Sequence, residues 1–338
     1  MKFIKSKSSI FGARYILGMI FFAILGFSIF PRSAEAKDLD KSSIIIKGKD
    51  GWLFPRWGSL KMRDDAGIDN STSLIGQVKN LLNSKDIKLE VLLLPDKVRF
   101  YQNKLPDEDV MSPEVLQRYA VILEKLNKVG ISTFDAEDVL RKVQKTGEDV
   151  FYRTDQHWTQ ASADAVAEAT AAMIKRDFPQ LSGTAGSGMT LGGPIKERRY
   201  GDLAELFLSP EEKKQIGRDT FIIRKESQTN SLIDDGVAPI HITGHSMVQP
   251  YFGFPQKLSN LLDRSVSLNW KSGNVGPWVM LLEYVESPAF KQKKPQVLVW
   301  QLFEPAYAQG PNAKGMWDNA SIMTEEAWLS RFKKAIKE

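Results

Sequence analysis

The sequence predicts an α/β domain in which helices flank a mostly parallel central sheet. Short apolar runs that fit strands alternate along the chain with stretches of helical periodicity, as expected of β-α-β units. With 42% hydrophobic and 26% charged residues among 338, the composition is that of a folded globular protein. The sequence shows no internal repeat, which excludes solenoids and propellers.

The first half of the domain contains four expected elements. Lys88–Leu94 fits a strand, because it is almost wholly apolar and Pro95 closes it. Residues 115–129 carry apolar side chains at helical spacing after Ser112 and Pro113, a pair typical of a helix start. A second short strand is expected at residues 131–135. The alanine-rich segment 159–178 is expected to be a helix, with Thr159 as its N-cap.

The second half begins after a segment rich in Gly, Ser and Thr at residues 182–193, which is expected to be a loop within one domain. The same criteria of apolar runs and helical periods define the elements that follow it. We expect strands at 220–224, 240–243 and 296–301 and helices at 254–262, 278–285 and 325–337.

Residues 1–36 have the three parts of a secretory signal: a lysine-bearing start, the uncharged apolar run Tyr15–Phe30, and small residues around Ala34 and Ala36. The apolar run is slightly long for a signal and short for a bilayer span of about 20 residues. The leader is therefore either a cleaved signal peptide or an uncleaved N-terminal anchor. In both cases we expect residues 37–338 to form a single domain in the periplasm.

The composition also excludes several classes of function. Cysteine is absent, which removes disulfides, thiolate nucleophiles, Cys-based zinc sites and iron–sulfur clusters. Residues 1–36 hold five basic residues and one acid, so the rest of the chain carries only +1 of the net charge of +5 and gives no sign of nucleic-acid binding. Outside the cytoplasm ATP and NAD are not supplied, which disfavours kinases and dehydrogenases, and we expect no cofactor.

Two short segments contain residues suited to nucleophilic catalysis. His157 lies in a polar segment before the alanine-rich helix, and Asp155, two residues earlier, could accept its Nδ1 proton and leave Nε2 as a general base. Ser246 follows an apolar strand and Gly244, where a tight turn would present its hydroxyl and supply backbone N–H groups to an oxyanion. The alternatives are an Asp that caps a turn beside a packed His, and a serine turn without chemistry. Together the three residues supply nucleophile, base and orienting acid.

The chain has three histidines, and the other two are weaker candidates. His241 and His245 lack an obvious third ligand, so no metal site is predicted. Aromatic side chains near the proposed site could stack on sugar rings, although most aromatic residues in any domain pack in the core. The residues in question are Tyr152, Trp158, Tyr251 and Trp300.

Four stretches in order resemble the exopolysaccharide O-acetyltransferases of the alginate type, the AlgJ/AlgX family, whose catalytic domain is SGNH-hydrolase-like. They are Gly48–Phe54, Leu94–Lys97 with Tyr101 and Leu105-Pro106 after it, Thr154–Thr159, and Gly244–Ser246. The region from Asn274 to Trp300 is also similar, so the resemblance covers residues 44–305. The chain departs from the family pattern at His245 and at Gln301 to Glu304.

The resemblance implies a periplasmic polysaccharide O-acetyltransferase in which Asp155 and His157 are acid and base and Ser246 carries the acetyl group. N–H groups at Ser246 and Gly276 would then stabilise the oxyanion. The expected partners are a polysaccharide acceptor, a membrane-bound O-acyltransferase that supplies acetyl groups, and other exopolysaccharide secretion proteins. Two alternatives stay open: a carbohydrate acetylesterase of the same fold, and a non-catalytic polysaccharide-binding subunit of a secretion complex.

Overall fold

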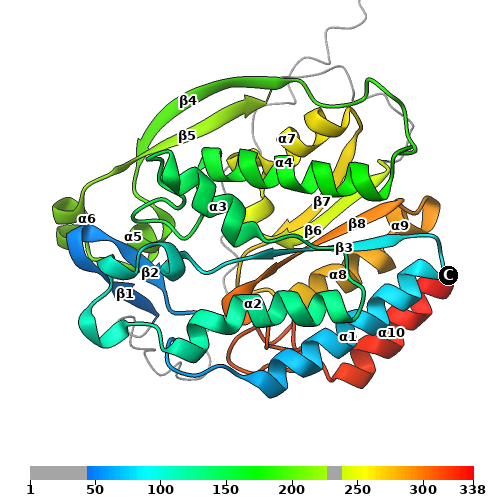
Figure 1. The fold of residues 1–338 in the computed structure, drawn as a ribbon, viewed down its shortest axis with the longest axis horizontal. Coiled ribbons are helices and arrows are strands. Elements are labelled where there is room, and N and C mark those ends of the chain that lie inside the picture. Colours follow the sequence, from blue (N-terminus) through cyan, green and yellow to red (C-terminus); the bar gives the residue numbers. More distant parts are fainter. Residues whose placement is uncertain (1–43, 227–237) are drawn as a thin grey trace, which may run out of the picture. The chain divides into compact units, whose positions relative to one another are not determined.

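A four-stranded parallel sheet lies at the centre of the fold (Figure 1). In the computed structural model, which describes residues 44–226 and 238–338, the strands lie in the order β3-β8-β6-β7 and every neighbouring pair is parallel. The expected α/β class with a parallel sheet is confirmed. The four strands are β3 (Lys88–Leu94), β6 (Ile240–His245), β7 (Val266–Lys271) and β8 (Val297–Phe303).

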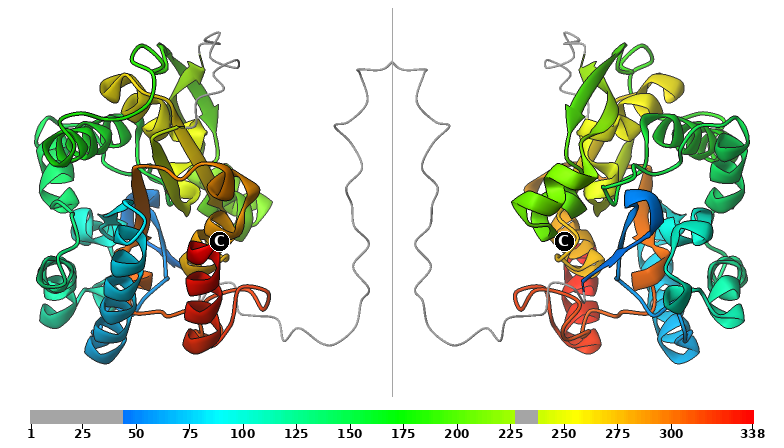
Figure 2. Two further views of the ribbon diagram at one scale, coloured as in Figure 1. Left: turned by 90° about the vertical axis from the view of Figure 1, so that its right-hand side faces the viewer. Right: turned by 90° about the vertical axis from the view of Figure 1, so that its left-hand side faces the viewer.

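Helices cover both faces of this sheet, which explains why β3 and β8 are almost continuous apolar runs and why every residue of β6 is buried. Figures 1 and 2 show the sheet between the two helical layers. The core on one face contains residues of α3 (Ala136–Lys145), α4 (Gln160–Asp177) and α7 (Phe254–Leu262). The core on the other face contains residues of α1 (Asp65–Asn83), α2 (Pro113–Lys128), α8 (Pro277–Glu286), α9 (Pro288–Gln292) and α10 (Glu325–Lys337).

The helices begin where the sequence provides capping side chains. Ser112 accepts the N–H of Val115 at the start of α2, and Thr159 accepts that of Ser162 at the start of α4. A capping hydroxyl satisfies an N–H that the helix itself leaves unpaired, a contribution of about 1 kcal/mol. α7 and α8 instead begin at glycines without a side-chain cap. The expected helices at 115–129, 159–178, 254–262, 278–285 and 325–337 agree with the structure within two residues at each end.

Two antiparallel pairs lie outside the central sheet. β1 (Ile45–Lys47) pairs with β2 (Leu53–Pro55), and β4 (Leu191–Arg199) pairs with β5 (Asp219–Glu226). The short helices α5 (Asp202–Phe207) and α6 (Pro210–Ile216) connect β4 to β5. The expected strand at 220–224 is thus present in β5. The expected loop at 182–193 ends three residues early, because β4 begins at residue 191.

One expected strand is wrong. Residues 131–135 form only a single bridge, between Ser132 and Glu90, because the chain turns at once into α3, whose N-cap is Asp135. Several elements of the structure were not predicted at all, among them α1, α3 and β7.

The predicted signal peptide or anchor at residues 1–36 lies outside the described residues. All described residues belong to one compact unit, Asp40–Glu338. Within that part of the chain, no helix combines the length and apolar character needed to cross a bilayer.

Candidate active site

Ser246 lies at the carboxyl end of β6, in the middle of the sheet edge where open α/β folds bind their ligands. It is the first residue of a 3-10 turn, Ser246–Val248. Gly244 makes this turn possible, because a Cβ there would lie 2.7 Å from Cβ of Gln301 on the neighbouring strand β8. The sheet itself therefore fixes the position of the serine.

Asp155 and His157 lie on a tight loop that leads into α4. The loop is closed by hydrogen bonds from Tyr152 N–H to the carbonyl of His157 (3.1 Å) and from Thr159 N–H to that of Val150 (3.0 Å). Because Thr159 is the N-cap of α4, the helix start fixes the histidine two residues before it. In this loop the carboxylate of Asp155 also accepts the backbone N–H of His157 at 2.9 Å.

The three residues form one continuous chain of hydrogen bonds. His157 Nδ1 lies 2.6 Å from Asp155 Oδ1, and His157 Nε2 lies 2.7 Å from Ser246 Oγ. A carboxylate only accepts, so Nδ1 carries the proton and Nε2 is free to accept the serine hydroxyl proton. All three are buried, with relative exposures of 0% for Asp155, 5% for His157 and 8% for Ser246. The structure thus brings together the residues that the sequence proposed as acid, base and nucleophile.

The electrostatics of the pair favour an ionised Asp155. Burial acts to raise the pKa of Asp155, but the charge and hydrogen bonds of His157 outweigh it and hold the pKa well below its usual range. Burial acts to lower the pKa of His157, but the charge and hydrogen bond of Asp155 raise it above its ordinary value. A base whose conjugate acid is stabilised in this way accepts a proton from a hydroxyl more readily.

Asp202 supports the pair, although sequence reasoning missed it. As the first residue of α5 it donates its backbone N–H to Asp155 Oδ2 at 2.9 Å, and its carboxylate lies 3.5 Å from His157 Nδ1. Burial and the charge of Asp155 raise the pKa of Asp202 to about 6. The preceding Gly201 allows this approach, because a Cβ there would lie 2.3 Å from the carbonyl of Thr154. No local pattern reveals a contact that spans 47 residues.

Among the described residues, one cluster has donor atoms close enough together to hold a metal ion. It consists of Asp155, His157 and Asp202, whose donor atoms lie within 4.8 Å of one another. Their oxygens, however, already accept N–H groups of His157, Asp202 and Gln156. The arrangement is that of a hydrogen-bonded base, and the mechanism below uses no metal.

The predicted aromatic residues occupy very different positions. Trp158 and Trp300 are fully buried, so the expectation that they contact substrate is wrong; one packs against Phe254 and the other against Trp278. Tyr152 is buried too, with its hydroxyl bonded to the backbone of β5 at residue 222. Tyr251 is the half-buried member of the set, and a substrate role for it stays a prediction.

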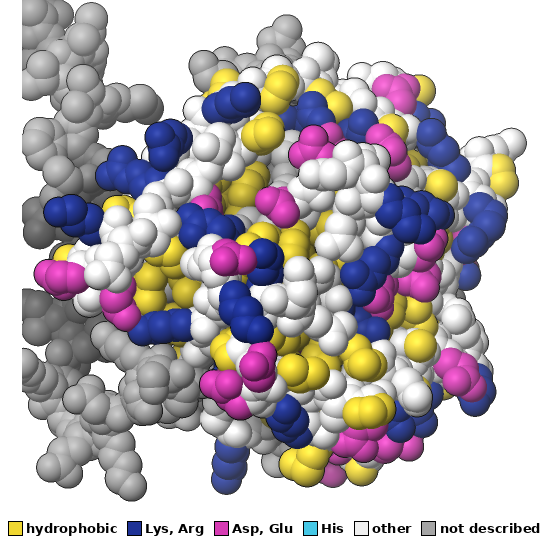
Figure 3. All heavy atoms as spheres, turned by 60° about the vertical axis from the view of Figure 1, so that its left-hand side comes forward, with side chains coloured by type: hydrophobic (Ala, Val, Ile, Leu, Met, Phe, Trp, Pro, Cys, Tyr) yellow, Lys and Arg dark blue, Asp and Glu magenta, His cyan; other side chains and the backbone are white. Residues whose placement is uncertain are grey.

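Around the base, the structure adds groups that the sequence did not single out. The ring of Phe252 stacks on that of His157 at a centroid distance of 4.5 Å, and Gln249 Nε2 lies 3.5 Å from His157 Nε2. The guanidinium of Arg199 lies over the ring of Tyr251 at 4.7 Å and reaches within 3.9 Å of Asp155 Oδ2. Arg199 and Tyr251 are both partly exposed, so they lie between the buried catalytic groups and solvent. On the molecular face of Figure 3, hydrophobic side chains gather near the middle, bordered by charged ones.

His245, where the chain departs from the family pattern, anchors the loop before α8. Its Nε2 lies 2.8 Å from the carbonyl of Val275, so Nε2 is the protonated nitrogen and Nδ1 carries the lone pair. Burial lowers the pKa of His245 to about 4, which keeps the ring neutral. Gln301 accepts the backbone N–H of His245 at 2.9 Å. Gly276 follows Val275 directly, and its proposed role at the oxyanion stays a prediction.

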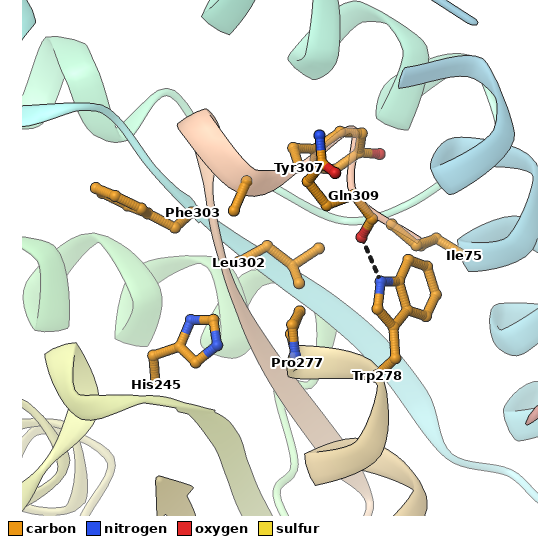
Figure 4. Close-up of a pocket in the computed structure, with 9 residues that line it drawn as sticks. Ile75, His245, Pro277, Trp278, Leu302, Phe303, Tyr307 and Gln309 are labelled. Atoms are coloured by element: carbon orange, nitrogen blue, oxygen red, sulfur yellow. Dashed lines mark hydrogen bonds between the residues drawn. The ribbon is translucent and has the colours of Figure 1, made fainter. Parts of the chain in front are cut away.

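Figure 4 shows the ring of His245 at a small cavity, with Pro277, Trp278 and Leu302 around it. The cavity measures only ≈ 10 Å³, about the space of one water molecule. Even-numbered residues of β6 face α4 and α7, whereas the odd-numbered His245 faces α8. This cavity therefore lies on the opposite face of the sheet from His157. The third histidine, His241, is a core residue between Ser267 and Asn269.

A serine at the end of a parallel strand, with a His–Asp pair from a loop, places this protein among the SGNH-hydrolase-like α/β proteins. Residues 45–304 match the family described as "SGNH hydrolase-like domain, acetyltransferase AlgX", and the chain belongs to this family.

Individual relatives agree with this assignment. The probable alginate O-acetylase AlgJ of Pseudomonas syringae is 26% identical over 333 residues, which cover 94% of this chain and 79% of the relative. The O-acetyltransferase domain of Pseudomonas putida AlgJ superposes with a TM-score of 0.70 at 22% identity and covers 86% of this chain and 99% of that one. Pseudomonas aeruginosa AlgX gives a TM-score of 0.55 at 18% identity, with 77% and 62% covered. The two superpositions show a shared fold.

Proposed function

We propose that this protein is an O-acetyltransferase that moves an acetyl group through an acetyl-Ser246 intermediate onto hydroxyl groups of an exopolysaccharide. The observation that supports it most is the hydrogen-bonded chain from Asp155 Oδ1 through His157 to Ser246 Oγ, with links of 2.6 and 2.7 Å. Relatives over most of the chain carry the name alginate O-acetylase, which favours a polysaccharide hydroxyl as acceptor.

In the first half-reaction Ser246 Oγ attacks the carbonyl carbon of an acetyl donor while His157 Nε2 takes the hydroxyl proton. The bond from the acetyl carbon to the leaving group breaks, and the leaving group receives that proton from His157. In the second half-reaction a sugar hydroxyl gives its proton to Nε2 and attacks the acetyl carbon. Ser246 then leaves and recovers the proton, so the enzyme returns to its starting state.

The developing oxyanion needs preorganised donors in a site with little water. The N–H groups that begin the 3-10 turn at Ser246 lack partners within the turn and point toward its start. We propose that they, with the N–H of Gly276, hold the oxyanion. The hydrogen bond between His245 and the carbonyl of Val275 would keep Gly276 in place.

We further propose that the domain works in the periplasm, where residues 1–36 would export it or anchor it. Acetyl-CoA is not available there, so a membrane-bound O-acyltransferase would pass acetyl groups to Ser246. Two relatives of the chain carry the names alginate O-acetylase and alginate biosynthesis protein, which supports partnership with other exopolysaccharide secretion proteins.

The test uses the purified full-length chain with a chromogenic acetyl ester, followed by intact mass and peptide mapping. Wild type should gain an acetyl group on Ser246, and the adduct should discharge faster to added oligosaccharide than to water. The variant S246A should gain none. The matched control is S272A, which removes an exposed serine just after β7 and should acylate like wild type.

Other results would select the alternatives. Rapid acetate release that is indifferent to sugar would identify an acetylesterase. Absence of any adduct in wild type, with glycan binding that survives in S246A, would identify a non-catalytic binding subunit.

A further inference from the structure

Lys97 is a fully buried lysine next to the candidate active site that the mechanism above does not use. It begins the 3-10 turn Lys97–Phe100 just after β3, and its relative exposure is 0%. A buried ammonium is costly unless the protein replaces the hydrogen bonds that water would provide. Burial lowers the pKa of Lys97 to about 7, against the opposing charges of Asp155 and Asp202. The protein must therefore compensate for the cost of burying the Lys97 ammonium.

Backbone carbonyls replace the water. Lys97 Nζ donates to the carbonyl oxygens of Leu53 (2.6 Å), Tyr152 (2.7 Å), Asp155 (2.9 Å) and Arg153 (3.0 Å). Three of these four belong to the loop that carries Asp155 and His157. An ammonium has three hydrogens, so at least one of them is shared between two carbonyls.

One feature distinguishes Lys97 from the buried cations Arg99 and Arg118. Arg99 and Arg118 pair with Glu304, whereas among the described residues no carboxylate lies within ion-pair distance of Lys97. Its ammonium lies 5.2 Å from the ring centroid of Trp52 and equally far from that of Phe54, both on the segment around β2. Aromatic faces favour a cation and exclude water. The site around Lys97 is thus built to hold a cation against backbone carbonyls.

The contacts fix two peptide groups of the loop, the one that follows Asp155 and the one that precedes Thr154. The carbonyl of Asp155 binds Lys97, while the N–H of the same peptide, on Gln156, donates to Asp202 Oδ1 at 2.8 Å. The carbonyl of Arg153 binds Lys97, while the N–H of Thr154 donates to Asp219 Oδ2 at 2.7 Å. Each of these two peptide planes is held at both ends, which restrains the backbone that carries Asp155.

We propose that Lys97 is a positioning residue for acetyl transfer: its ammonium gathers the carbonyls of the loop so that Asp155 and His157 stay in line with Ser246. Without the cation, three carbonyl dipoles would converge in a buried site and repel one another, and the loop would relax away from Ser246. This inference rests on the proposed function, because it assigns Lys97 to the same reaction.

The test is K97M in the full chain, a change that keeps an unbranched side chain as far as the ε position and removes the ammonium group. Displacement of a catalytic group by about 1 Å costs on the order of 100-fold in rate. We expect the rate constant for Ser246 acylation to fall by about that factor, with KM for the acetyl ester changed less than about threefold, because the ester site itself is intact.

A second readout reports on geometry without activity. With three histidines in the chain, proton NMR can resolve the His157 Nδ1–H that Asp155 holds at 2.6 Å. Its downfield resonance should be present in wild type and S246A and lost in K97M. The matched control is K79M, which removes a lysine whose Nζ donates to one carbonyl, that of Val129, at 2.7 Å. It should keep both the resonance and the acylation rate.

If K97M folds poorly, K97A offers a rescue experiment. The n-propylammonium ion replaces the atoms lost beyond Cβ and should restore acylation, whereas n-propanol should not. The proposal is overturned if K97M acylates at the rate of K79M, or if K97M is slow but retains the His157 resonance. It is also overturned if propanol rescues as well as the amine. A wild type that never acylates Ser246 would instead refute the proposed function, and the NMR comparison would still decide the role of Lys97.

Discussion

The substitution D155N tests the orienting role of Asp155, because this carboxylate accepts three N–H groups. Oδ1 accepts the backbone N–H and Nδ1–H of His157 at 2.9 and 2.6 Å, and Oδ2 accepts the N–H of Asp202 at 2.9 Å. An asparagine has one accepting oxygen and one donating nitrogen at this position. It cannot satisfy all three donors in either orientation.

The two orientations fail differently. With its oxygen toward His157, the amide points its NH₂ group at the N–H of Asp202, and two buried donors face each other. With its NH₂ toward His157, the ring must offer a lone pair at Nδ1, so the proton moves to Nε2, where it blocks the reaction with Ser246. One unsatisfied buried donor costs about 1–3 kcal/mol of stability. The wrong tautomer lowers the acylation rate by about 10³–10⁴ in related catalytic arrangements.

We therefore expect D155N to unfold at a lower urea concentration and to acylate Ser246 about 10³–10⁴ times more slowly in single-turnover mass spectrometry. The control is D202N, which neutralises a carboxylate 3.5 Å from His157 Nδ1 but keeps the backbone N–H that holds Asp155. Its rate should fall less than about tenfold, because the tautomer of His157 is unchanged. A D155N enzyme within tenfold of wild type, or no slower than D202N, would refute the reasoning.

Three other predictions concern charge. E304Q should lower the free energy of unfolding by about 1–3 kcal/mol in urea, because Arg99 and Arg118 lose the buried carboxylate that they share and keep only Glu137 and the more distant Asp96; an unchanged midpoint would contradict this. The acylation rate should rise with pH through the raised pKa of His157, so an inflection below the ordinary value of 6.5 would count against His157 as the base. Burial raises the pKa of Glu90 from 4.5 to about 8, so wild type should lose stability as pH rises across that interval, and E90Q should lose less; identical pH profiles would exclude the effect.

The sequence was sufficient wherever a local signal determined the structure. β3, α7 and α10 have the bounds expected from apolar runs and helical spacing, and Ser246 was found because a glycine-containing turn follows an apolar strand. β7 was missed because this edge strand is only half buried along most of its length, which weakens the apolar run that marks a buried strand.

Contacts between distant parts of the chain could not be predicted in this way. Asp202 and Lys97 reach the catalytic loop across 47 and 58 residues, and nothing in their local sequence indicates the partner. Trp158 was assigned to substrate because it lies next to His157 in sequence, and Trp300 because it lies at the end of a predicted strand. Both indoles fill the core instead.

The nucleophile and its base are held by different parts of the fold, and this separation determines which substitutions affect catalysis first. The sheet holds Ser246 through Gly244 and Gln301, whereas the loop holds His157 through Asp155, Lys97 and Asp202. Nucleophile and base are joined by one hydrogen bond of 2.7 Å, between residues 89 positions apart. A small shift of the loop changes that distance while leaving the two hydrophobic cores packed. Substitutions at the loop anchors should therefore lower the acylation rate well before they lower the melting temperature, whereas those in the core should do the reverse.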